Sequence, residues 1–338
     1  GRSISGIIQA NYTLLNRYVL QGTLSVEGNS AMGKNHRIGY FPAGGFSWNA
    51  QNEPFLKDVQ WIDEVKLRAS VGQTGGAPSG LSYFGTFSAI SPGYMDMSAV
   101  EPKSMQLNSL KWQTTTDFNI GGDFGFFKNR LRFTLDVYHR YTKDLLQKKV
   151  TIPSSTGYSQ LAYFNSGKME NYGWEARADV VFIQNKDWRF SGYVNLSHNT
   201  NKITELPVNM AQDAYTMKNG AYASIVEANR PVGSFYGYRY LGVYQNTEAT
   251  YARDASGAVM KDLKGNPIIM KNGQYTVYPG DAIYEDVNHD GVINQYDIVY
   301  LGNSNPILTG GAGLSLRWKD LTLSAFFYGN FGRKIINK

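Results

Sequence analysis

One segment in the last quarter of the chain carries oxygen-bearing side chains at a fixed spacing. Residues 286–297 read Asp-Val-Asn-His-Asp-Gly-Val-Ile-Asn-Gln-Tyr-Asp. This run matches the EF-hand loop pattern D-x-[DN]-x-[DN]-G with an acid at position 12. Carboxylate, amide and carbonyl oxygens at this spacing suit calcium, a hard cation. The sequence therefore predicts a calcium site with these ligands: Asp286, Asn288, Asp290, the Val292 carbonyl, Asn294 and Asp297.

The motif departs from the EF-hand pattern at its last position. Asp297 stands where the pattern has Glu. The shorter carboxylate can bind the ion through one oxygen rather than two, or it can favour a smaller ion. No helical pattern flanks the loop, so we expect a structural staple rather than a calcium sensor. The alternative is an Asx-rich turn that folds without a metal.

The other polar residues show no catalytic pattern. The four histidines form no H-E-x-x-H motif, and neither a P-loop nor a G-x-G-x-x-G run appears in a suitable context. Glu175 and Asp179 flank Arg177, and charge balance explains this arrangement better than glycoside hydrolysis. The absence of cysteine excludes a disulfide scaffold and a Cys-based zinc site. We therefore do not expect an enzyme.

Aromatic residues gather in segments that have no regular period. Tyr83 and Phe84 lie in one of them, and Tyr236 and Tyr238 lie in another. Exposed rings can stack on sugars or grip peptides, whereas buried rings pack the inside of a folded loop. These four residues are the candidate substrate-binding residues, with loop packing as the alternative.

Alternation with a period of two dominates the rest of the chain. In residues 130–138, Leu131, Phe133, Leu135 and Val137 alternate with charged and polar residues. Successive side chains of a strand point to opposite faces, so each such strand has one apolar face and one polar face. About ten segments repeat this pattern, and the one at 38–48 is ambiguous because Pro42 interrupts it.

Two architectures give this alternation. In a soluble sandwich the apolar face packs on a second sheet, whereas in an outer-membrane barrel it contacts lipid. The strands favour the barrel because several reach the length of about 9–11 residues that a tilted crossing needs. Aromatic residues near the strand ends also fit the two membrane interfaces, as at Trp174, Phe182, Trp188 and Trp318.

The lengths of the connectors give the strongest indication of a barrel. Short connectors near 16–17, 50–63, 128–129, 184–187 and 319–320 alternate with longer ones near 28–36, 74–112, 147–168 and 204–309. Outer-membrane barrels have short periplasmic turns and long extracellular loops, whereas a sandwich has no reason to keep this order. The sequence therefore predicts an all-β, transmembrane antiparallel β-barrel, with residues 1–338 a portion of it and a long extracellular loop at about 204–309.

Charge and hydropathy argue against a nucleic-acid-binding protein and against a membrane protein built of helices. The net charge of +6 comes from Lys and Arg spread singly along the chain, without a basic patch or motif for nucleic acid. No run approaches the length of about 18 apolar residues that a membrane-crossing helix requires. The chain opens with Gly1 and ends after an apolar strand, so we expect it to be a segment of a longer protein.

Several motifs resemble the SusC/RagA family, and they occur in the order found in that family. They are Arg17–Leu20, Gly33–Asn35, Gly39–Pro42, Lys66–Gly75, Pro231–Tyr238, the calcium-like loop, Leu301–Asn303 and Ser324–Gly329. The resemblance implies a barrel of about 22 strands in the outer membrane of Bacteroidetes. It further implies an N-terminal plug and TonB box, neither of which has a pattern in this chain.

The resemblance also implies a function. We expect TonB-dependent import of oligosaccharides or peptides, with a SusD-like surface lipoprotein as the lid and energy from TonB-ExbB-ExbD through a region outside this chain. One alternative is a siderophore or vitamin receptor on the same type of barrel. The other is a soluble, secreted β-protein that binds calcium and glycans.

Overall fold

A computed structural model describes residues 2–80, 83–91, 97–158, 160–206, 223–225 and 227–335. The chain divides into two compact units. The first, here called the sheet unit, comprises Gly1–Met210 and Pro306–Gly332. The second, the loop unit, comprises Ala211–Asn305 and Arg333–Lys338. Residues 207–222, inside the predicted loop at 204–309, lie outside the described part of the chain.

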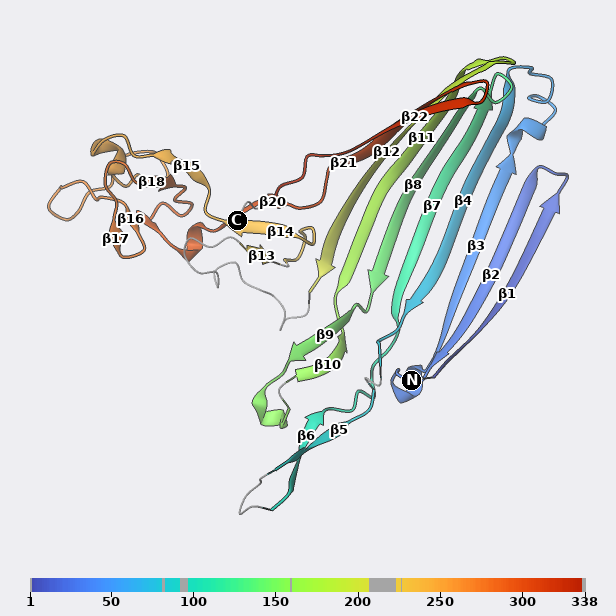
Figure 1. Ribbon diagram of the computed structural model, residues 1–338. Helices are drawn as coiled ribbons and strands as arrows, with labels where there is room; N and C mark the ends of the chain where they lie inside the picture. Colours follow the sequence, from blue (N-terminus) through green and yellow to red (C-terminus); the bar gives the residue numbers. More distant parts are fainter. Residues whose placement is uncertain are drawn as a thin grey trace. The chain divides into compact units, whose positions relative to one another are not determined.

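One antiparallel sheet of ten strands makes up most of the sheet unit (Figure 1). Each strand pairs with the next sheet strand along the chain, so the sheet is a meander. In order, the strands are β1 (Ser3–Leu14), β2 (Tyr18–Asn29), β3 (Ile38–Asn49), β4 (Ile62–Gly76), β7 (Gln113–Phe126), β8 (Leu131–Lys143), β11 (Lys168–Gln184), β12 (Trp188–Glu205), β21 (Leu308–Trp318) and β22 (Leu321–Phe331).

The register brings the predicted apolar stripes together on one side of the sheet, here called the apolar face. Ile120 on β7 lies opposite Val137 on β8, which in turn lies opposite Trp174 on β11. Ile120 is 68% exposed and Val137 is 52% exposed. A sandwich would bury these residues against a second sheet. Their exposure therefore agrees with the predicted barrel, in which lipid covers this face.

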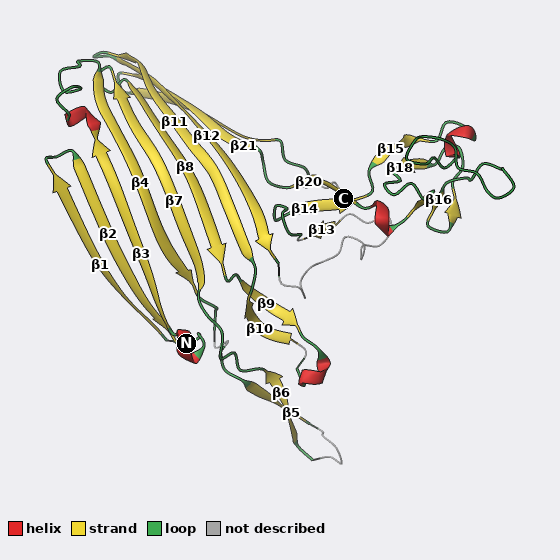
Figure 2. Cartoon of the chain, turned by 180° about the vertical axis from the view of Figure 1, so that it is seen from behind, coloured by secondary structure: helices red, strands yellow, loops and turns green. Residues whose placement is uncertain are grey.

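The connectors follow the predicted alternation, with tight turns at one end of the sheet (Figure 2). Leu15 and Asn16 join β1 to β2 with φ angles of 53° and 52°, and Lys128 and Asn129 join β7 to β8 with φ angles of 60° and 57°. Left-handed residues of this kind give a turn whose twist matches that of the two strands. The strands at this end are therefore joined closely.

The longer connectors leave from the opposite end and carry small hairpins. The link from β4 to β7 holds β5 (Thr86–Ile90) and β6 (Ala99–Ser104), and the link from β8 to β11 holds β9 (Leu146–Thr151) and β10 (Gln160–Asn165). Buried Leu107, Leu110 and Tyr163 pack together beside them. In their described residues, these two long connectors therefore contain regular structure.

The loop unit has its own small sheets and core. Its strands are β13 (Ala223–Ile225), β14 (Ser234–Gly237), β15 (Tyr240–Val243), β16 (Lys271–Asn272), β17 (Tyr275–Thr276), β18 (Ala282–Tyr284), β19 (Val292–Ile293) and β20 (Val299–Asn303). Its core contains Tyr236, Tyr238, Tyr244, Ala252, Met270, Val277, Ile293 and Ile298. The predicted loop at 204–309 thus contains a folded unit.

Helical structure is sparse. The described 3-10 turns are η1 (Lys34–His36), η2 (Ala50–Asn52), η4 (Ser154–Thr156), η7 (Glu248–Thr250) and η8 (Gln295–Asp297). Among the described residues, no helix has both the length and the hydropathy to cross a bilayer.

Candidate functional site

The polar face of the sheet, opposite the apolar face, is the first candidate site because ion pairs run across its strands. Arg68 on β4 donates to Asp123 on β7 at 2.8 Å and to Asp136 on β8 at 3.1 Å. Thr134 Oγ1 also donates to Asp123, at 3.2 Å. One guanidinium therefore joins three neighbouring strands and offsets two carboxylates.

A second polar group lies along β7, β8 and β11. Arg140 Nη2 lies 2.6 Å from Asp117 Oδ2, and the Tyr138 hydroxyl donates to Asn199 Oδ1 at 3.1 Å. The surrounding hollow has a volume of about 440 Å³ and is lined by Asp117, Asn119, Asp136, Tyr138, Arg140, Asn171, Glu175 and Asn199. Its amides, carboxylates and hydroxyl can bind the hydroxyl groups of a sugar or the amides of a peptide.

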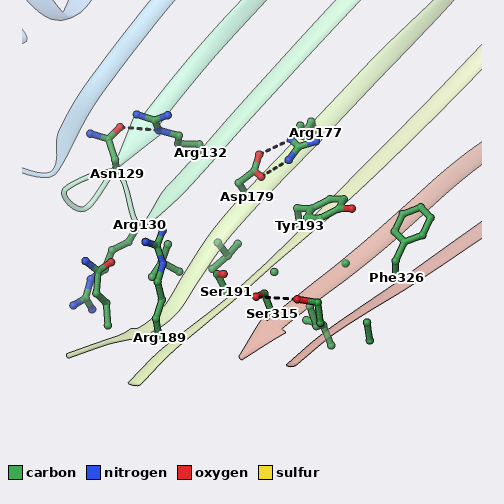
Figure 3. A pocket seen from close by; sticks show the side chains of 18 of the residues that line it. Asn129, Arg130, Arg132, Arg177, Asp179, Arg189, Ser191, Tyr193, Ser315 and Phe326 are labelled. Carbon is green, nitrogen blue, oxygen red and sulfur yellow. Dashed lines mark hydrogen bonds and ion pairs between the residues drawn. The ribbon is translucent and has the colours of Figure 1, made fainter. Parts of the chain in front are cut away.

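A third polar group lies near the tight turns, in a hollow of about 820 Å³ (Figure 3). Arg177 and Asp179 form two hydrogen bonds there, each 2.7 Å long. The Arg177 guanidinium also lies over the Tyr193 ring, 4.6 Å from its centroid. This pairing agrees with the prediction that charge balance accounts for Asp179.

The predicted calcium loop is built from carboxylates that accept backbone N–H groups. The two Asp286 carboxylate oxygens accept from the amides of Asp290 at 3.2 Å and Gly291 at 2.8 Å. Asp290 Oδ1 accepts from the amide of Val292 at 2.8 Å. Gly291 has a φ of 83°, which glycine adopts without strain, so the sequence pattern meets the backbone demand of this turn.

Asp297 closes the loop from its buried end. Its side chain is fully buried, and its two oxygens accept from the amides of Val287 and Asn294, both at 2.8 Å. Burial raises the pKa of Asp297, and the nearby negative charges of Asp286 and Asp290 raise it further. A bound cation would offset this crowding of carboxylates.

The donor chemistry of this loop fits a hard cation, and its present hydrogen bonds also fit a turn without metal. Asn294 Nδ2 donates to the Val292 carbonyl at 3.1 Å, so these two predicted ligands contact each other. Among the described residues, no three His, Cys, Asp or Glu side chains form a ready metal-binding group. Calcium binding by the six predicted ligands therefore stays a prediction.

The candidate substrate-binding rings lie in different surroundings. Tyr236 and Tyr238 are buried in the core of the loop unit, at 4% and 5% exposed, and burial raises the pKa of both. Tyr83 is buried too, whereas Phe84, which lies edge-on to it, is 43% exposed. Packing thus accounts for three of these rings. Ligand contact stays a prediction, and Phe84 is the ring best placed for it.

Sequence reasoning missed the partners of the charged residues on the polar face. Arg68, Asp123 and Asp136 each occupy a polar position of an alternating strand, which is the one signal that could have marked them. Their pairing depends on strand register, and the sequence does not state the register of strands far apart in the chain.

Comparison with known proteins places the chain in a family. The family described as TonB dependent receptor-like, beta-barrel matches residues 2–329. TonB-dependent receptor P3 of Formosa agariphila is 30% identical over 97% of this chain and 32% of its own length. TonB-dependent receptor SusC of Bacteroides thetaiotaomicron is 32% identical over 80% of this chain and 27% of its own length.

A solved structure shares the fold. The structure of the RagAB peptide transporter matches 96% of this chain and 33% of the solved chain, with a TM-score of 0.71 and 25% identity. The chain spans about a third of the length of the curated relatives that it matches. The resemblance to the SusC/RagA family and the outer-membrane location are thereby confirmed. The chain belongs to the TonB-dependent receptor family and forms part of its outer-membrane β-barrel.

Proposed function

We propose that the protein containing this chain imports oligosaccharides or peptides across the outer membrane, without catalysing a reaction on them. The observation that carries the proposal is the contrast between the two faces of the sheet. The apolar face is exposed along its length, whereas the polar face holds paired charges, as at Arg68 and Asp123. This arrangement suits a wall between lipid and a wet lumen.

The polar face would form one side of the transport path. The hollow around Tyr138, Arg140 and Glu175 offers donors and acceptors within reach of one ligand. Sugar hydroxyls and peptide amides need such groups, because each polar group that leaves water must find a partner. The likeness to SusC and to the RagAB peptide transporter supports these two classes of cargo.

We infer the partners from the same likeness. A SusD-like surface lipoprotein would close over the outer end of the barrel, and TonB-ExbB-ExbD would supply energy through a region outside this chain. The loop at 204–309 would lie on the extracellular side, where barrels of this class have their long loops. Calcium bound at Asp286, Asn288 and Asp290 would tie that loop down.

Growth of a deletion strain on single nutrients tests the proposal. The strain should fail on one class of oligosaccharide or peptide and recover when the full-length gene is restored. A Phe84→Ala variant should grow more slowly at limiting nutrient if that exposed ring contacts the cargo, and Phe55→Ala, an exposed ring in the short link between β3 and β4, is the matched control.

A different growth defect would contradict the proposal. A strain that grows normally on every oligosaccharide and peptide, and fails only when iron or a vitamin is scarce, would favour the siderophore or vitamin receptor instead.

A further inference from the structure

The hollow near the tight turns has far more positive than negative charge. It is lined by five cationic side chains and one carboxylate, namely Lys128, Arg130, Arg132, Arg177, Arg189 and Asp179, which together are called the arginine site (Figure 3). The other polar groups described above balance their charges more closely, since Arg68 faces two aspartates. Of the three polar groups described on this face, the arginine site therefore has the largest excess of positive charge.

The one carboxylate is already fully engaged. Both Asp179 oxygens accept from Arg177, in the two-point geometry that guanidinium and carboxylate prefer. Arg132 donates to the side-chain oxygen of Asn129 at 3.1 Å, which is a neutral partner. In the part of the chain that the structure describes, neither Arg130 nor Arg189 has a carboxylate within ion-pair distance. Among the described residues, no carboxylate therefore offsets the positive charges of Arg130 and Arg189.

The strand register adds another cation beside the site. Arg189 on β12 lies directly opposite Arg317 on β21. Like charges at directly opposed positions of an antiparallel pair destabilise the sheet. The pairing of β12 with β21 thus places two positive charges side by side, and a bound anion would reduce their repulsion.

We propose that the arginine site binds a carboxylate or sulfate group carried by the imported cargo. Unpaired guanidinium groups bind such oxyanions through paired, charge-assisted hydrogen bonds. Ser191, Ser315 and Tyr193 line the same hollow and supply hydroxyl groups beside them. The inference rests on the proposed import function and narrows the cargo to acidic molecules.

Calorimetric titration of the purified full-length protein with inorganic sulfate at low ionic strength tests this inference. The variant joins R130Q, R132Q and R189Q, and the matched control joins K57Q, K261Q and K264Q, three exposed lysines outside the hollow. Wild-type protein and the control should bind sulfate alike. The arginine variant should bind it at least about tenfold more weakly, because it lacks three charge-assisted contacts.

Two results would overturn the inference. One is equal sulfate affinity in the wild-type protein and the arginine variant. The other is the absence of sulfate binding by the wild-type protein. A lower melting temperature of the arginine variant would then identify an acidic segment of the protein itself as the group that fills the site. Circular dichroism should show that the control and the arginine variant are both correctly folded, so that a change in sulfate affinity does not reflect unfolding.

Growth measurements distinguish a failure of this inference from a failure of the proposed import function. Cells with the arginine variant should lose growth on an acidic nutrient that the wild-type protein supports, and should keep growth on a neutral one. Equal growth on both would overturn the inference and leave import standing. If no nutrient depends on the protein at all, import itself fails, whatever the sulfate titration shows.

Discussion

The Tyr18 hydroxyl donates a 2.6 Å hydrogen bond to the Glu53 carboxylate, joining the start of β2 to the short link between β3 and β4. Trp48 Nε1 donates to the same oxygen at 3.1 Å, and Arg17 Nη1 lies 3.2 Å from the other oxygen. Glu53 is only 7% exposed. One buried carboxylate therefore ties together two neighbouring turns at the tight end of the sheet.

Replacing this carboxylate by an amide should loosen the tight end. We expect Glu53→Gln to lower the unfolding temperature of the full-length barrel in detergent, because Arg17 loses its negative partner. Heat modifiability on electrophoresis measures this temperature. Glu101→Gln, at an exposed position of β6, is the control and should leave it unchanged. Equal temperatures for wild type and Glu53→Gln would show that the contact contributes nothing.

The same carboxylate gives a pH dependence. The hydrogen bond from Tyr18 holds the pKa of Glu53 below its usual range, with further lowering by Trp48 and Arg17. A lowered pKa in the folded state means that the contribution is fully present above the usual Glu pKa. It is lost as the pH falls through the folded-state pKa. As the pH falls from the usual Glu pKa to the folded-state pKa of Glu53, the unfolding temperature of the wild type should therefore fall more than that of Glu53→Gln.

Gly75 on β4 lies against the ring of Phe41, which is buried with Met32 and Trp112. A Cβ at position 75 would clash with Phe41 Cζ, so even alanine forces the ring to move. We expect Gly75→Ala to destabilise the barrel by about 1–3 kcal/mol in urea unfolding, a typical effect of overpacking. Gly22→Ala on β2 is the control, because a Cβ there meets no atom within 4 Å. An equally small effect at both positions would contradict this account.

The strands could be read from the sequence, because lipid and a wet lumen impose opposite demands on alternate residues. Even the ambiguous segment at 38–48 is a strand, β3, despite Pro42. Its pairing with β4 runs only from Ala43 to Asn49, so the ladder on that side ends next to the proline. A proline at the end of a ladder removes no hydrogen bond from it.

The surroundings of the loop residues could not be read in the same way. Tyr236 and Tyr238 lie in a segment with no long periodic pattern, so nothing in their spacing distinguishes a buried ring from an exposed one. Their burial depends on contacts with residues far along the chain, such as Ile293 and Ile298. The arginine site was missed for a related reason, since Arg132, Arg177 and Arg189 come together only through the pairing of β8 with β11 and of β11 with β12.

Calcium binding by the loop at 286–297 can be measured with terbium, which replaces calcium and emits when a tyrosine lies nearby. Tyr244 lies close enough to Asp286 for that carboxylate to contribute to the rise in its pKa, although burial is the larger cause. We expect the full-length protein to give terbium emission, and we expect this emission to fall when calcium displaces the terbium ion. The double variant Asp286→Asn, Asp290→Asn should weaken binding at least about tenfold, because it removes two charged ligands.

The control for the metal experiment is a second aspartate turn in the loop unit. Asp262 Oδ1 accepts from the amides of Lys264 and Asn266, both at 2.8 Å, so Asp262→Asn perturbs a similar turn outside the predicted site. Emission should be unchanged in that variant. Removal of calcium with a chelator should also lower the melting temperature of the wild-type protein. No emission and no effect of the chelator would identify the loop as a turn that needs no metal.

Collision measurements on spin labels test the division between lipid and lumen most directly. Asn119 and Ile120 are neighbours on β7 that point to opposite faces, and this chain contains no cysteine. In the full-length protein in liposomes, a label at Ile120→Cys should collide mainly with dissolved oxygen. A label at Asn119→Cys should instead collide mainly with a water-soluble nickel chelate. Equal or reversed accessibilities at the two positions would contradict a wall with hydrocarbon on one side and water on the other.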